Sequence, residues 1–123
     1  MPVDKNSVAK LVDFTKGSGL VPAIAQDVNT GKVLMLAYMN AEALETTLKE
    51  GRACYWSRSR KELWRKGQTS GDIQIVKDVL VDCDEDTILL LVEQQGLGAC
   101  HTRKWSCFYR RITSGGDLEA VHD

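Results

Sequence analysis

Hydrophobic and polar residues alternate along most of this chain with the two-residue period of β-strands, and a helical period appears in two short stretches. Strands are predicted over residues 22–28, 32–39, 53–57, 72–83, 87–93 and 107–112. Helices are predicted over residues 4–14 and between the N-cap Asn40 and Gly51. This pattern favours an α+β fold, mainly antiparallel sheet with two or three short helices.

Local signals refine this outline. Asn29-Thr30-Gly31 predicts a hairpin turn between the first two strands. In the strand at 72–83, one face is predicted to carry the apolar residues Ile73, Ile75, Val79, Val81 and Cys83. Lys77 is the exception on that face. Residues 87–93 are apolar throughout, which is typical of a more buried strand. Residues 113–123 are expected to form a loose tail.

Composition narrows the class of protein. The 123 residues suit a single domain, 1–123, and 16 Lys+Arg against 17 Asp+Glu argue against a generally basic nucleic-acid binder. No apolar stretch is long enough to cross a membrane, and the N-terminus lacks the apolar core of a signal peptide. A cytoplasmic location with reduced thiols is therefore expected. There, Cys54, Cys83, Cys100 and Cys107 favour metal binding or catalysis over disulfides.

The acidic run DCDEDT holds three alternating aspartates, Asp82, Asp84 and Asp86. In an extended chain they share one side, where the oxygen-only set suits Mg²⁺ or Ca²⁺. An EF-hand is rejected because Thr87 stands where that loop needs glycine. A solvated hairpin tip and a calcium-binding β domain stay open. Cys83 would face the other side, which argues for two separate metal sites.

Cys100 and Cys107 bracket the segment HTRKWS. They reach one zinc ion only if residues 101–106 double back, and Gly96 and Gly98 supply the flexibility for such a turn. With Cys83 they would make three thiolates and leave a fourth position for water, as in catalytic zinc sites. Three small buried hydrophobic residues are the alternative. His101 is interpreted as a general acid or base, and His122 as inert.

A basic segment follows the third predicted strand. The segment holds five basic residues and one acidic residue, Glu62, and small hydroxyl-bearing residues flank it. The basic residues are Arg58, Arg60, Lys61, Arg65 and Lys66. Such a segment suits a phosphate group, and Tyr55, Trp56 and Trp64 offer faces for base stacking. A solvated basic helix with core aromatic residues would show the same composition.

Four stretches together resemble the phosphoribosyl-AMP cyclohydrolase family, in its free-standing form: LVPAIAQDVNTGKVLMLAYMN (20–40), YWSRSRKELWRKGQTSG (55–71), DCDEDTILLLVEQQG (82–96) and ACHTRKWSCFYR (99–110). They cover about half of the chain. Members often carry glycine two residues after the histidine, where this chain has Arg103. The resemblance implies hydrolytic opening of the adenine ring of phosphoribosyl-AMP between N1 and C6, in histidine biosynthesis.

The resemblance also implies an intertwined homodimer with zinc between subunits, held by Cys83 of one chain and by Cys100 and Cys107 of the other. Asp82, Asp84 and Asp86 would hold Mg²⁺, and Cys54 has no counterpart among the ligands. Zinc would acidify the attacking water, as in zinc deaminases, with His101 as the candidate proton donor to N1. Substrate contacts are expected from Trp56, Ser57, Arg58, Ser59, Arg60, Trp64, Lys66, Thr69 and Ser70.

The main alternative is a non-catalytic, zinc-stapled nucleotide-binding module. It predicts a closed site with a fourth protein ligand, His101 or Cys54.

Overall fold

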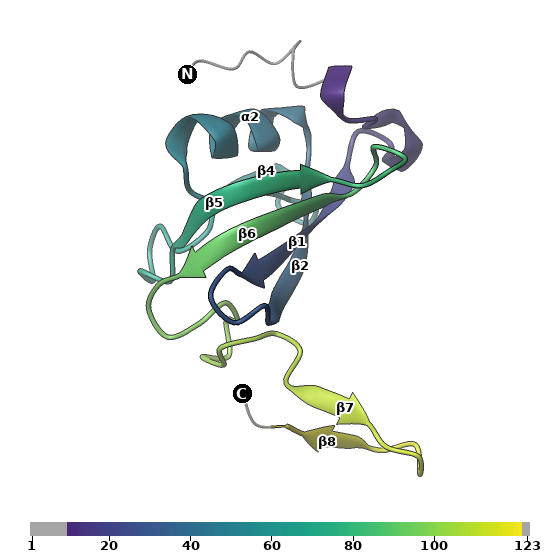
Figure 1. The fold of residues 1–123 in the computed structure, drawn as a ribbon, viewed down its shortest axis with the longest axis vertical. Helices are drawn as coiled ribbons and strands as arrows, with labels where there is room; N and C mark the ends of the chain where they lie inside the picture. The colour runs from purple at the N-terminus through teal and green to yellow at the C-terminus, as the bar shows by residue number, and fades with distance from the viewer. Residues whose placement is uncertain (1–9, 122–123) are drawn as a thin grey trace.

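A computed structural model describes residues 10–121 and centres on a four-stranded sheet (Figure 1). The strand order is β2-β1-β6-β5, with bounds β1 Val21–Asp27, β2 Val33–Met39, β5 Gln74–Val81 and β6 Ile88–Gln94. The β1–β2 and β5–β6 pairs are antiparallel hairpins, and the central β1–β6 pair is parallel. The mixed α+β class with a mainly antiparallel sheet is therefore confirmed.

One face of this sheet is covered by α2, Ala41–Glu50, and by a hairpin of β3, Cys54–Ser57, and β4, Glu62–Arg65. The Asn40 side chain accepts a 2.8 Å hydrogen bond from the Ala43 amide, and Gly51 ends the helix with φ 71°. Both ends of α2 thus lie where the capping pattern predicts them. The core between these layers is built from alternate residues of the central strands, including Ala23, Ala25, Ile88, Leu90 and Val92.

The basic segment contains strand β4 rather than a helix. Tyr55 pairs with Trp64 across the β3–β4 hairpin, and their ring centroids are 5.6 Å apart. Tyr55 is fully buried and donates a 2.6 Å hydrogen bond to Gln74, so the hairpin is tied to the main sheet. Cross-strand aromatic pairing of this kind stabilises the hairpin, and the helical interpretation of the segment is wrong.

The strand predicted at 72–83 does not keep one apolar face. A β-bulge between Val76 and Asp78 shifts its register against β6 at Lys77. Val79 and Val81 therefore pair with Leu90 and Ile88 on the core side, whereas Ile75 pairs with Glu93 on the other side.

A second hairpin, β7 Arg110–Ile112 and β8 Leu118–Ala120, projects away from the sheet (Figure 1). The expected loose tail is thus wrong at β8, because residues 118–120 pair with β7. Every residue of both strands is exposed. The hairpin has no partner layer among residues 10–121.

Helical structure is sparser than predicted. Among the described residues, the complete helical elements are the 10-residue α-helix α2 and a 3-10 turn, η1, Thr15–Gly17. Most of the helix predicted at 4–14 lies outside the described residues; Lys10 and Leu11 are helical, and residues 12–14 are not. No helix in the described part of the chain has the length and apolar character needed to cross a membrane.

Candidate active site

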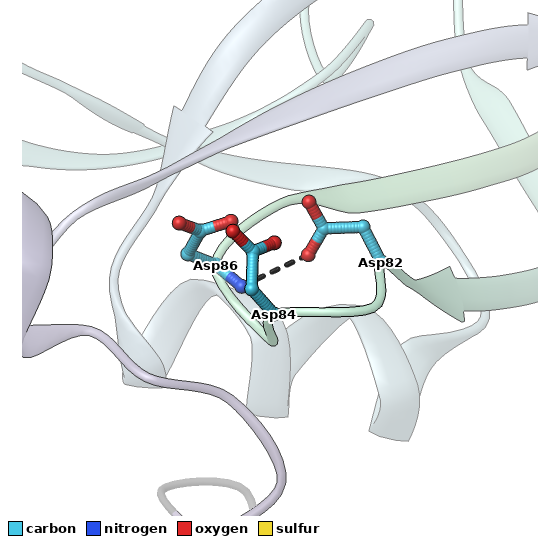
Figure 2. A group of neighbouring side chains, drawn as sticks. All are labelled: Asp82, Asp84 and Asp86. Carbon is cyan, nitrogen blue, oxygen red and sulfur yellow. Dashed lines mark hydrogen bonds between the residues drawn. The ribbon is translucent and has the colours of Figure 1, made fainter.

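The three aspartates meet in the turn between β5 and β6 (Figure 2). Their carboxylate ligand atoms all lie within 4.8 Å of one another, and no other group of three or more such ligands occurs among the described residues. The convergence is as predicted, but its cause is different. The chain turns here: Glu85 has φ 64°, and Asp82 accepts the amides of Asp86 at 3.0 Å and Thr87 at 3.1 Å.

The electrostatics of this loop favour a cation. Hydrogen bonds with the carboxyl groups of Asp86 and Asp82 raise the pKa of Asp84 above its ordinary value. Lys16 already provides one positive charge, because its Nζ lies 3.4 Å from Asp86 Oδ2 and 3.1 Å from the Asp84 carbonyl oxygen. Oxygen donors that repel one another and attract an ammonium group have the chemistry of a hard-cation site.

Cys100 and Cys107 come together because the loop between them doubles back, which is the condition that the sequence set for a shared ion. The Ala99 amide donates to the Trp105 carbonyl at 2.9 Å, and the Cys100 amide to that of Lys104 at 3.2 Å. A Cβ on Gly98 would overlap the backbone of residues 104–105, so this close approach needs glycine.

The two thiols differ in their tendency to ionise. Burial opposes ionisation of Cys100, but hydrogen bonds with Thr102, whose Oγ1 is 2.9 Å from the sulfur, and with Cys107, together with the charge of Lys66, lower its pKa overall. Cys107 has an exposed surface, yet its thiol is partly desolvated; this desolvation and then the Cys100 thiolate raise its pKa to about 11. A cation bound to both sulfurs would displace their protons.

The other two cysteines lie apart from this pair. Cys83 is exposed in the β5–β6 turn, at one end of β6, whereas the segment carrying Cys100 and Cys107 follows the other end. The length of β6 separates these ends by about 20 Å. Cys54 is fully buried beneath α2, where its backbone amide and carbonyl both bond to Thr47.

A cavity of about 400 Å³ lies between the β4 segment and the loop that follows Cys100. It brings together predicted residues from distant parts of the chain: Arg60, Trp64, Lys66, Thr69, Ser70 and His101. Arg65 of the predicted phosphate-binding segment also lines it, as do Asp72 and Arg103, which the sequence pattern did not mark as site residues. Trp56, Ser57, Arg58 and Ser59 are not lining residues; the Arg58 guanidinium lies 4.0 Å from the centroid of the Tyr38 ring.

Lys66 links this cavity to the thiol pair. It is only 7% exposed, and burial lowers its pKa against the attraction of Asp72, Cys107 and Cys100. Asp72 is fixed by the Leu97 amide, which donates to its Oδ1 at 3.0 Å. This hydrogen bond holds the pKa of Asp72 below its ordinary value. A Cβ on Gly67 or Gly96 would overlap Asp72, so the two glycines are the sequence signal that marks it.

These observations define a small α+β protein with a basic, partly aromatic pocket beside a thiol pair, and with an acidic loop at the opposite end of β6. Residues 35–109 match the family model described as phosphoribosyl-AMP cyclohydrolase. The chain belongs to the phosphoribosyl-AMP cyclohydrolase family.

Curated relatives bearing that name cover most of the chain. A protein of Chlorobium chlorochromatii strain CaD3 is 61% identical over 115 residues, which are 92% of this chain and 83% of that protein. One of Desulforapulum autotrophicum is 58% identical over 106 residues, covering 86% of this chain and 85% of its own. One of Nitratidesulfovibrio vulgaris strain DP4 is 63% identical over 103 residues, covering 84% and 82%.

Proposed function

We propose that this protein hydrolyses the N1–C6 bond of the adenine ring of phosphoribosyl-AMP and yields the formimino-AICAR ribotide of histidine biosynthesis. Water adds across the bond: oxygen joins C6, and N1 gains a proton as the ring opens. Membership of the family supports this proposal. The observation that carries it is the cavity, which is lined both by the basic β4 segment and by His101 and Arg103.

The cavity walls suit the two ends of such a substrate. Lys66 supplies positive charge for a phosphate group, and Thr69 and Ser70 supply hydroxyl donors. Arg60 and Arg65 also line this wall, where Arg60 pairs with Glu62 at 3.6 Å and Arg65 with Glu50 at 3.0 Å. Trp64 offers an aromatic face to a purine. The phosphate site is thus proposed on the β4 side of the cavity, and Arg58, which stacks on Tyr38, is a less suitable phosphate ligand than its sequence position indicated.

His101 is the proposed proton donor to N1. His101 lines the cavity together with the β4 segment, and imidazole is a common proton donor in catalysis. Protonation of N1 removes the negative charge that would otherwise develop on the departing nitrogen. Asp72 accepts a hydrogen bond from the Leu97 amide, and Lys66 is attracted to Cys100. Both residues therefore help to position the segment that carries His101.

The donor groups fit two metals of different character. Asp82, Asp84 and Asp86 would hold Mg²⁺ through oxygen atoms alone. Cys100 and Cys107 would hold zinc with Cys83 of a second copy, because Cys83 of the same chain lies at the far end of β6. Zinc supplies an acidified water, with a pKa near ~7, when it is bound.

The direct test is to incubate the zinc- and magnesium-loaded protein with phosphoribosyl-AMP, and to follow product absorbance and the gain of one water by mass spectrometry. His101→Ala is expected to retain zinc and lose roughly 10²-fold in kcat. Near-normal turnover would contradict the role of His101. Tight nucleotide binding without any product would contradict catalysis and favour the non-catalytic module.

A further inference from the structure

Arg103 holds a backbone conformation that an arginine adopts only at a cost. Its φ is 72°, in the left-handed region, where a Cβ crowds the neighbouring backbone. The residue closes a tight turn, in which its amide donates to the Cys100 carbonyl at 3.0 Å. Glycine would take the same φ without strain, so an arginine here indicates a use for its side chain.

The charge of Arg103 is available to a ligand. Arg103 is exposed and lines the cavity together with His101, two residues before it in the same turn. The cavity's other two arginines, Arg60 and Arg65, are each paired with a glutamate. In the part of the chain that the structure describes, no carboxylate lies within ion-pair distance of the Arg103 guanidinium.

Asp72 receives the charge of Arg103 at longer range. The Leu97 hydrogen bond is the main cause of the lowered pKa of Asp72, and attraction to Lys66 and then to Arg103 adds to it. The two cations therefore lie in one region of the cavity, around a carboxylate that the backbone already holds. This region can offer more than one positive group to an anionic substrate.

The proposed substrate carries two phosphate groups. One belongs to AMP, on the ribose at N9 of the purine, and the other to the phosphoribosyl group at N1. Each has a charge of about −1.5 to −2 at pH 7 and needs a cationic partner when it leaves water. N1 and N9 are on opposite sides of the fused rings, so the two phosphates need separate partners. Lys66, Thr69 and Ser70 are the proposed partners of one, and the second still needs a cation.

We infer that Arg103 binds the phosphate of the N1-linked ribose, an inference that rests on the proposed function. His101 is the proposed proton donor to N1, and Arg103 follows it in the same turn and lines the same cavity. Arg103 therefore lies at the N1 side of the purine, where its guanidinium can donate two parallel hydrogen bonds to phosphate oxygens. It distinguishes phosphoribosyl-AMP from AMP, which lacks this phosphate.

Arg103→Gly tests the inference, because it affects stability and binding in opposite directions. Glycine relieves the left-handed backbone, so the melting temperature should rise. Loss of the guanidinium should raise KM for phosphoribosyl-AMP about tenfold or more, with kcat changed by less than about twofold. The inhibition constant of AMP, used as a competitive inhibitor, should not change. Arg103→Lys keeps the charge but not the paired donors, and its KM should be intermediate.

Lys104→Gln is the matched control. It removes a positive charge from the next residue, which is exposed, does not line the cavity and has its Nζ 5.7 Å from the centroid of the Tyr109 ring. Its KM should equal that of the wild-type protein. An equal rise of KM in Lys104→Gln would mean that overall charge, and not contact with Arg103, attracts the substrate, and would overturn the inference.

Two further results would overturn it. One is an unchanged KM in Arg103→Gly, and the other is an equal rise in the inhibition constant of AMP, which would place Arg103 at the AMP phosphate. A wild-type protein that opens no ring would instead contradict the proposed function. Calorimetric titration then decides the inference, since Arg103→Gly should bind phosphoribosyl-AMP more weakly and AMP as before.

Discussion

The backbone amide of Cys107 donates a hydrogen bond of 2.7 Å to the carbonyl of Leu34, which fixes one thiol of the pair to edge strand β2. The Ser106 hydroxyl reinforces the link by donating to the Val33 carbonyl at 2.8 Å. The thiol pair is therefore held by the sheet as well as by its own loop.

Because backbone hydrogen bonds anchor this segment to β2, loss of any one proposed thiol should reduce zinc binding without unfolding the chain. Cys83→Ser, Cys100→Ser and Cys107→Ser are each expected to lose tight zinc and activity. Cys54→Ser is the matched control, since Cys54 is buried beneath α2, away from the pair. Zinc content of the four purified proteins by mass spectrometry gives the answer; zinc loss in the Cys54 variant would refute the ligand set.

Sharing of the site between subunits is tested by mixing two inactive proteins, Cys83→Ser and Cys107→Ser, and refolding them together. About half of the dimers should be mixed, and each mixed dimer has one intact site and one doubly broken site. Roughly a quarter of wild-type activity should return. Native mass spectrometry must show that mixed dimers form; mixed dimers without activity would mean that all three thiols act within one chain.

The acidic loop should bind Mg²⁺ independently of the thiols. Asp84→Asn is expected to weaken Mg²⁺ binding about tenfold or more, because it removes one of three clustered carboxylates. Lys16→Met should strengthen it by about two- to fivefold, since the ammonium group beside Asp86 no longer competes. Calorimetric titration measures both, and zinc content should be unchanged. Loss of zinc from folded Asp84→Asn protein would contradict two separate sites.

Asp72 should make stability depend on pH. The Leu97 amide holds the Asp72 pKa below its unfolded value, so its carboxylate stabilises the fold above that unfolded pKa. This contribution is lost as the pH falls through the lowered folded-state pKa. Asp72→Asn keeps an acceptor oxygen but not the charge, and should cost about 1 kcal/mol at pH 7. Urea unfolding at pH 7 and at pH 3 should show the difference shrinking; an equal loss at both would refute the charge effect.

Where the sequence pattern succeeded, local signals were sufficient. The cap at Asn40, the turn at Gly31 and the close approach at Gly98 each depend on a few neighbouring residues. The backbone conformation of Arg103 is a further example of a local requirement. This residue has φ 72°, a left-handed conformation that glycine adopts without strain, so the structure accounts for a glycine at the position where the family resemblance led us to expect one.

The failures arose where distant parts of the chain decide the outcome. Lys77 interrupted the apolar pattern of its strand, and only the register against β6 shows that it marks a bulge. The high charge of the segment after Ser57 is typical of a solvated helix, and this led to the wrong interpretation. Its strand structure depends on Trp64 packing on Tyr55, which the sequence pattern does not reveal. The cavity could not be predicted either, since Asp72 reaches it through contacts with the loop after β6.

The parallel pairing of β1 with β6 has a consequence for how the chain folds. Ala23 pairs with Ile88, so this contact closes a loop of roughly 65 residues, whereas both hairpins beside it are local. Loop-closure entropy delays such a contact, and the β1–β2 and β5–β6 hairpins should form before they join. Until then β6, apolar on both sides, is an unprotected strand edge. The newly made chain is therefore most prone to aggregate in the interval before its two halves meet.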